Sequence, residues 1–287
     1  MLNLARHAPV YVLNATVPRA GLTVTHDVAF GDLPRQKLDI YRPLHGADLP
    51  VIIYFYGGSW RTGSKAIYPF VAATMARAGA VVVVPNYRLY PDVVYPAFLQ
   101  DCARAVAWAT LHRSQLGSEG PLFLMGHSAG AYNTMMLGLD PTWLRQAGAG
   151  NTPIAGLIGL AGPYDFLPIT NPEIQPVFPN PEPSTQPINH IQARSQARTP
   201  PLLLLTGSDD RQVKPRNTQA LASKIASAGG TVTTHTYPEL GHIGLITAIA
   251  PIFQWRAPVL RDVMGFVGGK MPFQPPSGVP KPPNPAT

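Results

Sequence analysis

The segment PLFLMGHSAGAYNTMMLGL, residues 121–139, constrains the fold of this chain more than any other. Its apolar beginning is typical of a buried strand, and the residues after Gly130 are typical of a helix. Between them lies Gly126-His127-Ser128-Ala129-Gly130, whose glycines permit a turn too sharp for a Cβ at either flank. The segment therefore predicts a strand that passes through a tight turn directly into a helix.

The rest of the chain repeats this alternation of short β-rich runs and longer helical ones, with no internal repeat. We therefore predict an α/β fold with a mostly parallel central sheet flanked by helices, opened by one antiparallel pair of strands. The predicted strands are 22–31, 36–43, 51–58, 80–89, 121–125, 154–162, 201–210 and 231–238, and the predicted helices are 67–79, 97–117, 131–139, 215–229 and 241–249.

Residues 163–199 carry so many prolines that no long helix or central strand can form there. We interpret this stretch as an ordered excursion that forms a small lid above the functional site, in preference to a free linker. The expected organisation is an N-terminal segment, 1–21, a single α/β domain, 22–267, and a Pro-rich tail, 268–287. That tail is expected to be disordered or draped over the surface.

The composition excludes several classes of protein. With 287 residues, 45% of them hydrophobic, the chain can bury a large core, and its single cysteine, Cys102, is predicted to lie in that core. The net charge of +7 comes from scattered Lys and Arg residues, which favours a solvated basic surface over a nucleic-acid partner. No apolar run is long enough for a transmembrane helix. No secretory signal is visible, so the default expectation is a cytoplasmic protein, unless a leader has been lost. The oligomeric state stays open.

Three motifs follow one another along the chain: YGGSW at 56–60, NYRLYP at 86–91 and GHSAG at 126–130. In this order they resemble carboxylesterases of the α/β-hydrolase fold whose oxyanion loop reads HGGxW. These include feruloyl-esterase-like and hormone-sensitive-lipase-like esterases, isoprenylcysteine methylesterases and kynurenine formamidases. The resemblance covers about Leu22 to Val267. It implies that Ser128 is a nucleophile, exposed at the carboxyl edge of the sheet, with a helix N-terminus behind it.

A serine nucleophile needs a base, and the base needs a carboxylate that orients it. In this fold the order along the chain is serine, acid, histidine, which favours His242, on a loop after the last strand. His235 lies within a predicted strand and His190 within the excursion, where it would be poorly held. The remaining histidines precede Ser128 or lie inside the turn: His7, His26, His45, His112 and His127.

Two adjacent aspartates end the strand that precedes this histidine. The family pattern GxxDxxV aligns Gly207 with Asp210 and Val213, so it favours Asp210 as the acid and leaves Asp209 as a loop-shaping or surface carboxylate. Asp165 is a third candidate, because some hydrolases place the acid one strand earlier. Its alternative role is to anchor the start of the excursion.

The paired glycines after the third predicted strand suit an oxyanion hole, because a backbone without side chains lets amides approach a carbonyl. The resemblance implies donors at Gly57, Gly58 and Ala129, with Ser59 as a further candidate. Tyr56 stands where the family usually has histidine, and we expect the phenol to brace the loop without titrating near neutrality. Trp60 either wedges the loop against the sheet or lines the acyl pocket. His127 is a further candidate for support or for the substrate pocket, and Tyr87 and Arg88 are expected to tie neighbouring loops together.

The sequence therefore predicts a serine hydrolase that cleaves small or medium acyl or aryl esters through an acyl-enzyme, with Ser128, His242 and Asp210 as the catalytic residues. Amide hydrolysis, of N-formylkynurenine or a short peptide, is the alternative within enzymes, and a non-catalytic binding module is the alternative outside them. The expected partner is a small-molecule ester. No cofactor or metal is expected, because no dinucleotide motif and no metal-ligand spacing is apparent.

Overall fold

A computed structural model describes residues 13–191 and 199–268 of the chain. The predicted Pro-rich tail from residue 269 onward and the start of the N-terminal segment, residues 1–12, lie outside these described residues. Leu13 and Val17, from the remainder of that segment, are buried in the same core as the central sheet. Within the described residues, no helix has the length and apolar character needed to cross a membrane.

The central sheet has eight strands among the described residues, in the order β1-β2-β4-β3-β5-β6-β7-β8. Strand β2 pairs antiparallel with both β1 and β4, and all further pairs are parallel. The predicted mostly parallel sheet is therefore confirmed, and so is the antiparallel pair β1–β2 at its start; the second antiparallel pairing, of β2 with β4, was not predicted. The strands are β1 (Leu22–Ala29), β2 (Lys37–Pro43), β3 (Val51–Phe55), β4 (Val81–Pro85), β5 (Leu122–His127), β6 (Ile154–Leu160), β7 (Leu202–Gly207) and β8 (Val232–Tyr237).

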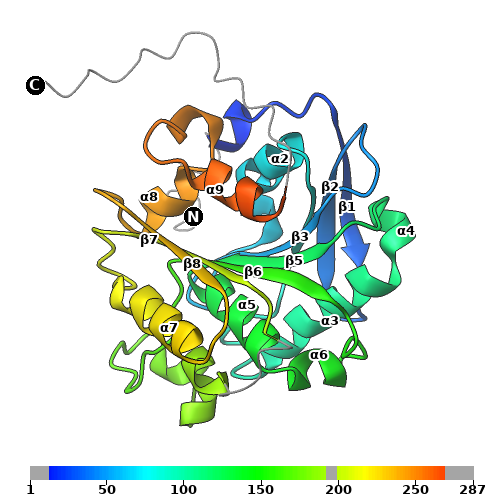
Figure 1. Ribbon diagram of the computed structural model, residues 1–287. Helices are drawn as coiled ribbons and strands as arrows, with labels where there is room; N and C mark the ends of the chain where they lie inside the picture. The colour runs from blue at the N-terminus through cyan, green and yellow to red at the C-terminus, as the bar shows by residue number, and fades with distance from the viewer. Residues whose placement is uncertain (1–12, 192–198, 269–287) are drawn as a thin grey trace, which may run out of the picture.

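Helices cover both faces of this sheet (Figure 1). On one side lie α2 (Pro69–Arg77), α8 (His242–Thr247) and α9 (Val259–Phe266), and on the other lie α3 (Ala97–Leu111), α5 (Ala129–Leu139), α6 (Thr142–Gln146) and α7 (Arg216–Ser227). Because both faces are covered, the inner strands are buried along their whole length, which explains their continuous apolar runs.

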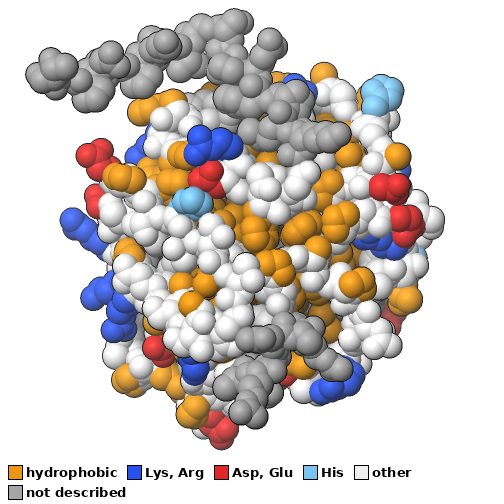
Figure 2. All heavy atoms as spheres, viewed as in Figure 1, with side chains coloured by type: hydrophobic (Ala, Val, Ile, Leu, Met, Phe, Trp, Pro, Cys, Tyr) orange, Lys and Arg blue, Asp and Glu red, His pale blue; other side chains and the backbone are white. Residues whose placement is uncertain are grey.

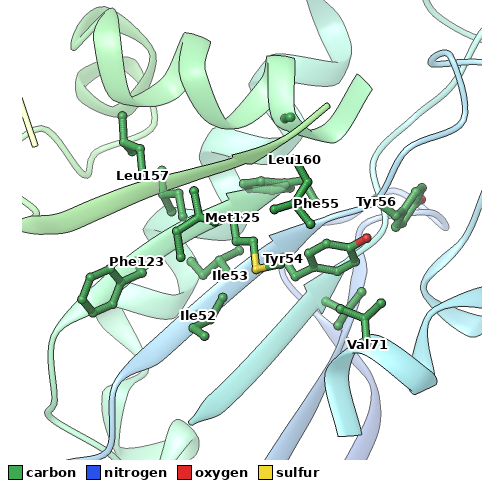
Figure 3. Close-up of a cluster of buried hydrophobic side chains, with 14 of the residues drawn as sticks. Ile52, Ile53, Tyr54, Phe55, Tyr56, Val71, Phe123, Met125, Leu157 and Leu160 are labelled. Atoms are coloured by element: carbon green, nitrogen blue, oxygen red, sulfur yellow. The ribbon is translucent and has the colours of Figure 1, made fainter. Parts of the chain in front are cut away.

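The core is built around β3 and β5, which pair in parallel with Phe55 opposite Gly126 (Figure 3). Side chains on these strands alternate between the two faces and pack against the covering helices and the neighbouring strand β6. This packing fixes the carboxyl ends of β3 and β5, where the predicted functional residues follow. The labelled core residues are Ile52, Ile53, Tyr54, Phe55, Tyr56, Val71, Phe123, Met125, Leu157 and Leu160.

The predicted single helix over 97–117 was wrong, because the chain breaks at His112 into α3 and the short helix α4 (Arg113–Leu116). The His112 ring stacks on Trp108, with ring centroids 4.6 Å apart, and its Nδ1 lies 2.8 Å from the Trp108 carbonyl oxygen. The His112 amide still donates to the Trp108 carbonyl at 2.9 Å, but the His112 backbone, with φ of −116° and ψ of 39°, has left the helical region, so α3 ends there. Gly117, with φ of 66°, ends α4.

The Pro-rich stretch contains no long helix and no strand over its described residues, as predicted. It forms only the single-turn 3₁₀ helices η2 (Gln175–Val177), η3 (Pro183–Thr185) and η4 (Pro187–His190). Two further 3₁₀ turns are η1 (Lys65–Ile67) and η5 (Pro251–Phe253). On the face drawn in Figure 2, Lys and Arg side chains lie at several separate places among polar and apolar ones.

Candidate active site

Ser128 occupies the sharp turn between β5 and α5. Its backbone has φ of 55° and ψ of −122°, a conformation that costs free energy for a residue other than glycine. The turn is held on both sides, because the Ser128 amide donates to the Leu160 carbonyl at 2.8 Å and the Tyr132 amide donates to the Ser128 carbonyl at 3.1 Å. The side chain is partly exposed at the N-terminus of α5. The predicted strand–turn–helix geometry is therefore present.

The two glycines of this turn stand where no side chain fits. A Cβ on Gly126 would lie 2.1 Å from the Gly130 carbonyl oxygen, and a Cβ on Gly130 would lie 1.9 Å from the Phe55 carbonyl oxygen. Both obstacles are backbone atoms, which cannot move aside as a flexible side chain can. The glycines therefore let the turn close against the end of β3.

His242 and Asp210 form a buried pair. Asp210 lies in the loop after β7, and His242 is the first residue of α8, not a loop residue as predicted. His242 Nδ1 lies 2.7 Å from Asp210 Oδ2, and the two residues are 6% and 3% exposed. Asp210 Oδ1 accepts the backbone amides of Gln212 and Val213, each at 2.9 Å, which fixes the carboxylate plane. Since a carboxylate accepts, Nδ1 carries the proton, and Nε2 of the neutral ring is left as a base.

The competing candidates lie elsewhere. Asp209 is exposed and accepts the Ser208 hydroxyl at 2.8 Å, and Asp165 is exposed, with its backbone amide held by Asn217. His235 points from the outer strand β8 to solvent. His190 bonds to the Ser184 carbonyl within the excursion. Of the acids and histidines weighed above that lie within residues 13–191 and 199–268, only Asp210 and His242 form a pair.

His127 lies between this pair and the paired glycines. Its ring centroid is 4.7 Å from that of His242, and its Nε2 lies 3.2 Å from the His242 carbonyl oxygen. On the other side, a Cβ on Gly57 would lie 3.1 Å from His127 Nδ1 and 3.0 Å from the Ser128 Cβ. The start of α8, which carries His242, and the loop that carries Gly57 are thus both packed against the turn at Ser128.

Burial lowers the pKa of His127 well below its usual range, so this ring stays neutral in the folded chain. In the unfolded chain it takes up a proton near pH 6.5, so the unfolded state binds more protons below that pH. We therefore expect the free energy of unfolding to fall as the pH drops below about 6.5, by at most about 1.4 kcal/mol per pH unit from this residue.

Urea unfolding at pH 5, 6, 7 and 8 measures this effect. His127→Gln should flatten the pH dependence, and the exposed His235→Gln is the matched control. Equal slopes in wild type and His127→Gln would contradict the assignment of a neutral buried ring.

The loop after β3 turns back sharply at its paired glycines. Three successive residues have positive φ: Gly58 at 133°, Ser59 at 55° and Trp60 at 56°. The amides of Arg61 and Thr62 both donate to the Gly58 carbonyl at 3.0 Å, which closes the turn. Gly57 is buried against Ser128, whereas Ser59 is exposed. Ala129 is the first residue of α5, so its amide lies in the first turn, where helical amides lack a carbonyl partner within the helix.

Trp60 anchors this loop against helix α5. It is 2% exposed, and its indole Nε1 donates to Asn133 Oδ1 on α5 at 3.0 Å. The indole packs edge-on against Tyr132 and Phe178, at centroid distances of 5.1 and 4.9 Å, and stacks with Phe166 at 6.2 Å. Trp60 is therefore a wedge between the loop and α5, and the Pro-rich excursion packs onto it.

The excursion also contains an open hollow of about 500 Å³. It is lined mainly by apolar residues, and Phe178 belongs both to this hollow and to the aromatic cluster around Trp60. The lining residues are Leu167, Pro168, Ile169, Gln175, Phe178, Pro179 and Pro181.

Tyr56 is buried and lies between two aromatic rings. Its ring stacks on Tyr68 and Tyr87 at centroid distances of 5.5 and 4.8 Å, and the Tyr87 hydroxyl donates to the Tyr56 carbonyl at 2.7 Å. Arg88 pairs with the buried Asp101 on α3 at 2.8 Å. Tyr87 and Arg88 thus tie loops to neighbouring elements, as expected. Sequence reasoning missed Asn133, because nothing in the sequence around it signals a contact with Trp60.

Across residues 13–191 and 199–268, no group of three His, Cys, Asp or Glu side chains could hold a metal ion. The polar groups gathered at the carboxyl edge of the sheet are one hydroxyl, one imidazole–carboxylate pair and a glycine-rich loop. That set suits nucleophilic attack on a carbonyl and proton transfer.

Comparisons with known proteins agree with this geometry. The BD-FAE family matches residues 38–225. Kynurenine formamidase of Danio rerio is 33% identical over 144 residues, which cover 50% of this chain and 47% of that protein. Esterase LipC of Mycobacterium tuberculosis is 31% identical over 154 residues, which cover 51% of this chain and 38% of that protein.

Among solved structures, an inhibited esterase B from Lactobacillus rhamnosis superposes with a TM-score of 0.80 at 18% identity, over 93% of this chain and 92% of that one. At this identity the likeness concerns the fold, which is that of an α/β-hydrolase. The chain spans about half or less of the length of the two curated relatives named above.

Proposed function

The chain belongs to the BD-FAE family, and on that premise we propose that it is a serine hydrolase that cleaves carboxylic esters through an acyl-enzyme. The observation that carries the proposal is the partly exposed Ser128 in a strained turn, packed against Gly57 on one side and, through His127, against the His242–Asp210 pair on the other. Acyl transfer needs a nucleophile, an oriented base and amide donors. The proposal assigns these roles to Ser128, to His242 with Asp210, and to the amides of the paired-glycine loop and Ala129.

In the proposed reaction, Ser128 Oγ attacks the ester carbonyl carbon while its proton passes to His242 Nε2. The imidazolium that forms is stabilised by Asp210, which already accepts the Nδ1 proton at 2.7 Å. The negative charge moves to the carbonyl oxygen, where amides of Gly57, Gly58 and Ala129 donate to it. The intermediate expels the alkoxide, which takes the proton from His242. Water then repeats the sequence on the acyl-enzyme and regenerates the Ser128 hydroxyl.

We propose esters of small or medium acyl or aryl groups as substrates. The excursion contributes Phe166 and Phe178 to the aromatic cluster on Trp60, two residues after the second of the paired glycines, and the hollow of about 500 Å³ beside Phe178 is mainly apolar. We propose that the acyl group enters this hollow, whose apolar lining favours aryl and short alkyl groups because they gain free energy when they leave water.

Amide hydrolysis of the formylkynurenine type is the second candidate, favoured by the similarity to a relative named kynurenine formamidase. The same nucleophile, base and donors serve both reactions, and only the pocket for the leaving group differs. The fold alone does not separate the two reactions.

A substrate series tests the proposal. We expect kcat/KM to be highest for p-nitrophenyl acetate and butyrate, to fall for acyl chains of about ten carbons or more, and to exceed the value for N-formylkynurenine. A preference for N-formylkynurenine would favour the formamidase alternative. No turnover of any ester or of N-formylkynurenine would overturn the proposed function.

A further inference from the structure

The Tyr56 hydroxyl is held by two side chains from distant parts of the sequence. It donates to Asn86 Oδ1 at 2.9 Å and accepts from Arg35 Nη2 at 3.1 Å. Burial raises the pKa of Tyr56, so its hydroxyl keeps the proton that Asn86 accepts. Tyr56, which begins the paired-glycine loop, is therefore held at its hydroxyl as well as by the two rings stacked on it.

Arg35 uses its guanidinium to join three segments. Besides Tyr56, Nη2 donates to the Gly63 carbonyl at 2.5 Å, and Nε donates to the Tyr87 carbonyl at 2.6 Å. Among the described residues, no carboxylate lies within 4 Å of this half-buried cation. Its donors are directed at neutral oxygens of the loop and of the segment that follows β4.

The contacts at Gly63 show how closely the loop folds onto Tyr56. A Cβ on Gly63, whose φ is 108°, would lie 2.9 Å from the Tyr56 ring and 2.9 Å from the Gly57 carbonyl oxygen. The Gly63 carbonyl that Arg35 binds thus belongs to a residue packed directly against the first loop glycine. A shift of this carbonyl would be transmitted to Gly57.

Asn86 ties the two ends of the same loop. Its Oδ1 accepts both the Tyr56 hydroxyl and the Lys65 backbone amide, the latter at 2.8 Å. Lys65 is fixed a second time, because its Nζ lies 2.5 Å from Asp39 Oδ1. The loop ends are therefore held at Asn86, and its return path is held by Arg35.

We propose that Arg35 is a positioning residue of the oxyanion loop: its planar fork fixes Tyr56, Gly63 and Tyr87 relative to one another, and thereby aims the Gly57 and Gly58 amides. The inference rests on the proposed function. A guanidinium holds several acceptors in a set geometry, whereas an ammonium acts as a point charge on a flexible stem. Donors aimed at an oxyanion lose most of their effect when they are displaced by about 1 Å.

The test compares Arg35→Met and Arg35→Lys with wild type. Arg35→Met should lower kcat for p-nitrophenyl butyrate roughly 10- to 100-fold with little change in KM, because the loop acts on the transition state. Arg35→Lys should restore only a small part of this loss. Arg77→Met is the matched control, since Arg77 also donates to a backbone carbonyl, of Ala20, but on the exposed end of α2.

Two further measurements separate positioning from a general loss of structure. The affinity for a trifluoromethyl ketone, whose adduct with serine carries an oxyanion, should fall by the same factor as kcat/KM. Tyr56→Phe removes only the hydroxyl, and the double variant Arg35→Met with Tyr56→Phe should be no slower than Arg35→Met alone, because both act through one network. If the rate losses of the two single variants multiplied in the double variant, the inference would be overturned.

Hydrogen–deuterium exchange gives a readout that needs no activity. Arg35→Met should speed exchange in the peptide 56–65 and leave β5 unchanged. Unchanged exchange in 56–65, or full rescue of kcat by Arg35→Lys, would overturn the inference. Absence of hydrolysis by wild type would instead sink the proposed function and leave the exchange result to decide the role of Arg35.

Discussion

Ser128→Ala is expected to lower kcat for p-nitrophenyl acetate and butyrate by roughly 10⁴- to 10⁶-fold without unfolding the chain. The hydroxyl is the only group that the substitution removes, and in the proposed reaction its oxygen forms the bond to the acyl group. Alanine lacks a β-substituent that could conflict with the turn, although it keeps the strained φ of 55°. The measurement is initial rate at saturating ester, with circular dichroism and thermal melting as checks on the fold.

The exposed Ser184→Ala, in the Pro-rich excursion, is the matched control and should keep the wild-type rate. A folded Ser128→Ala protein that retains more than about 1% of wild-type turnover would contradict the assignment of this serine as nucleophile.

Gly130→Ala is expected to lower the free energy of unfolding more than an alanine at any other glycine whose Cβ contacts are given above. The new Cβ would lie 1.9 Å from the Phe55 carbonyl oxygen and 2.6 Å from the Tyr56 carbonyl oxygen, both on the backbone of the central strand and its extension. Relief requires α5 to move away from β3, which opens the core. We expect a loss of about 3 kcal/mol or more in the free energy of unfolding, measured by urea denaturation.

Gly265→Ala provides the control for this prediction, because it adds the same methyl group within helix α9, where no described atom outside the adjoining residues and the helix's own backbone lies within 4 Å. It should raise the free energy of unfolding by up to about 1 kcal/mol, since alanine is the better helix former. Equal stability of the two variants would show that the close packing of Gly130 is unimportant.

The strands and the turn at Ser128 could be predicted from the sequence because their signals are local. A buried parallel strand is a continuous apolar run, and the turn at Ser128 needs glycines at fixed positions, so both can be recognised within a few residues. The structure contains the predicted strands in one sheet, and Asp210 forms a hydrogen-bonded pair with His242. The helix α9 was missed, although its buried Val259, Leu260, Val263 and Met264 follow helical spacing.

The support of the paired-glycine loop could not be predicted, because it depends on tertiary contacts. Tyr56 can be recognised as a departure from the HGGxW pattern, but nothing local indicates that Arg35, from the turn between β1 and β2, reaches its hydroxyl. The same holds for Trp60, for which the sequence left open a wedge or a pocket wall, and for the break at His112. In each case the deciding partner is chosen by three-dimensional packing and not by a local pattern.

Covalent labelling with a fluorophosphonate tests the central claim most directly, because it needs no knowledge of the natural substrate. The reagent phosphonylates a serine only where a base activates it. We expect a single adduct, located by peptide mass spectrometry on Ser128, that is absent in Ser128→Ala and forms much more slowly in His242→Gln. Failure of the folded wild-type protein to react, or an adduct on a different serine, would contradict a catalytic centre at this turn.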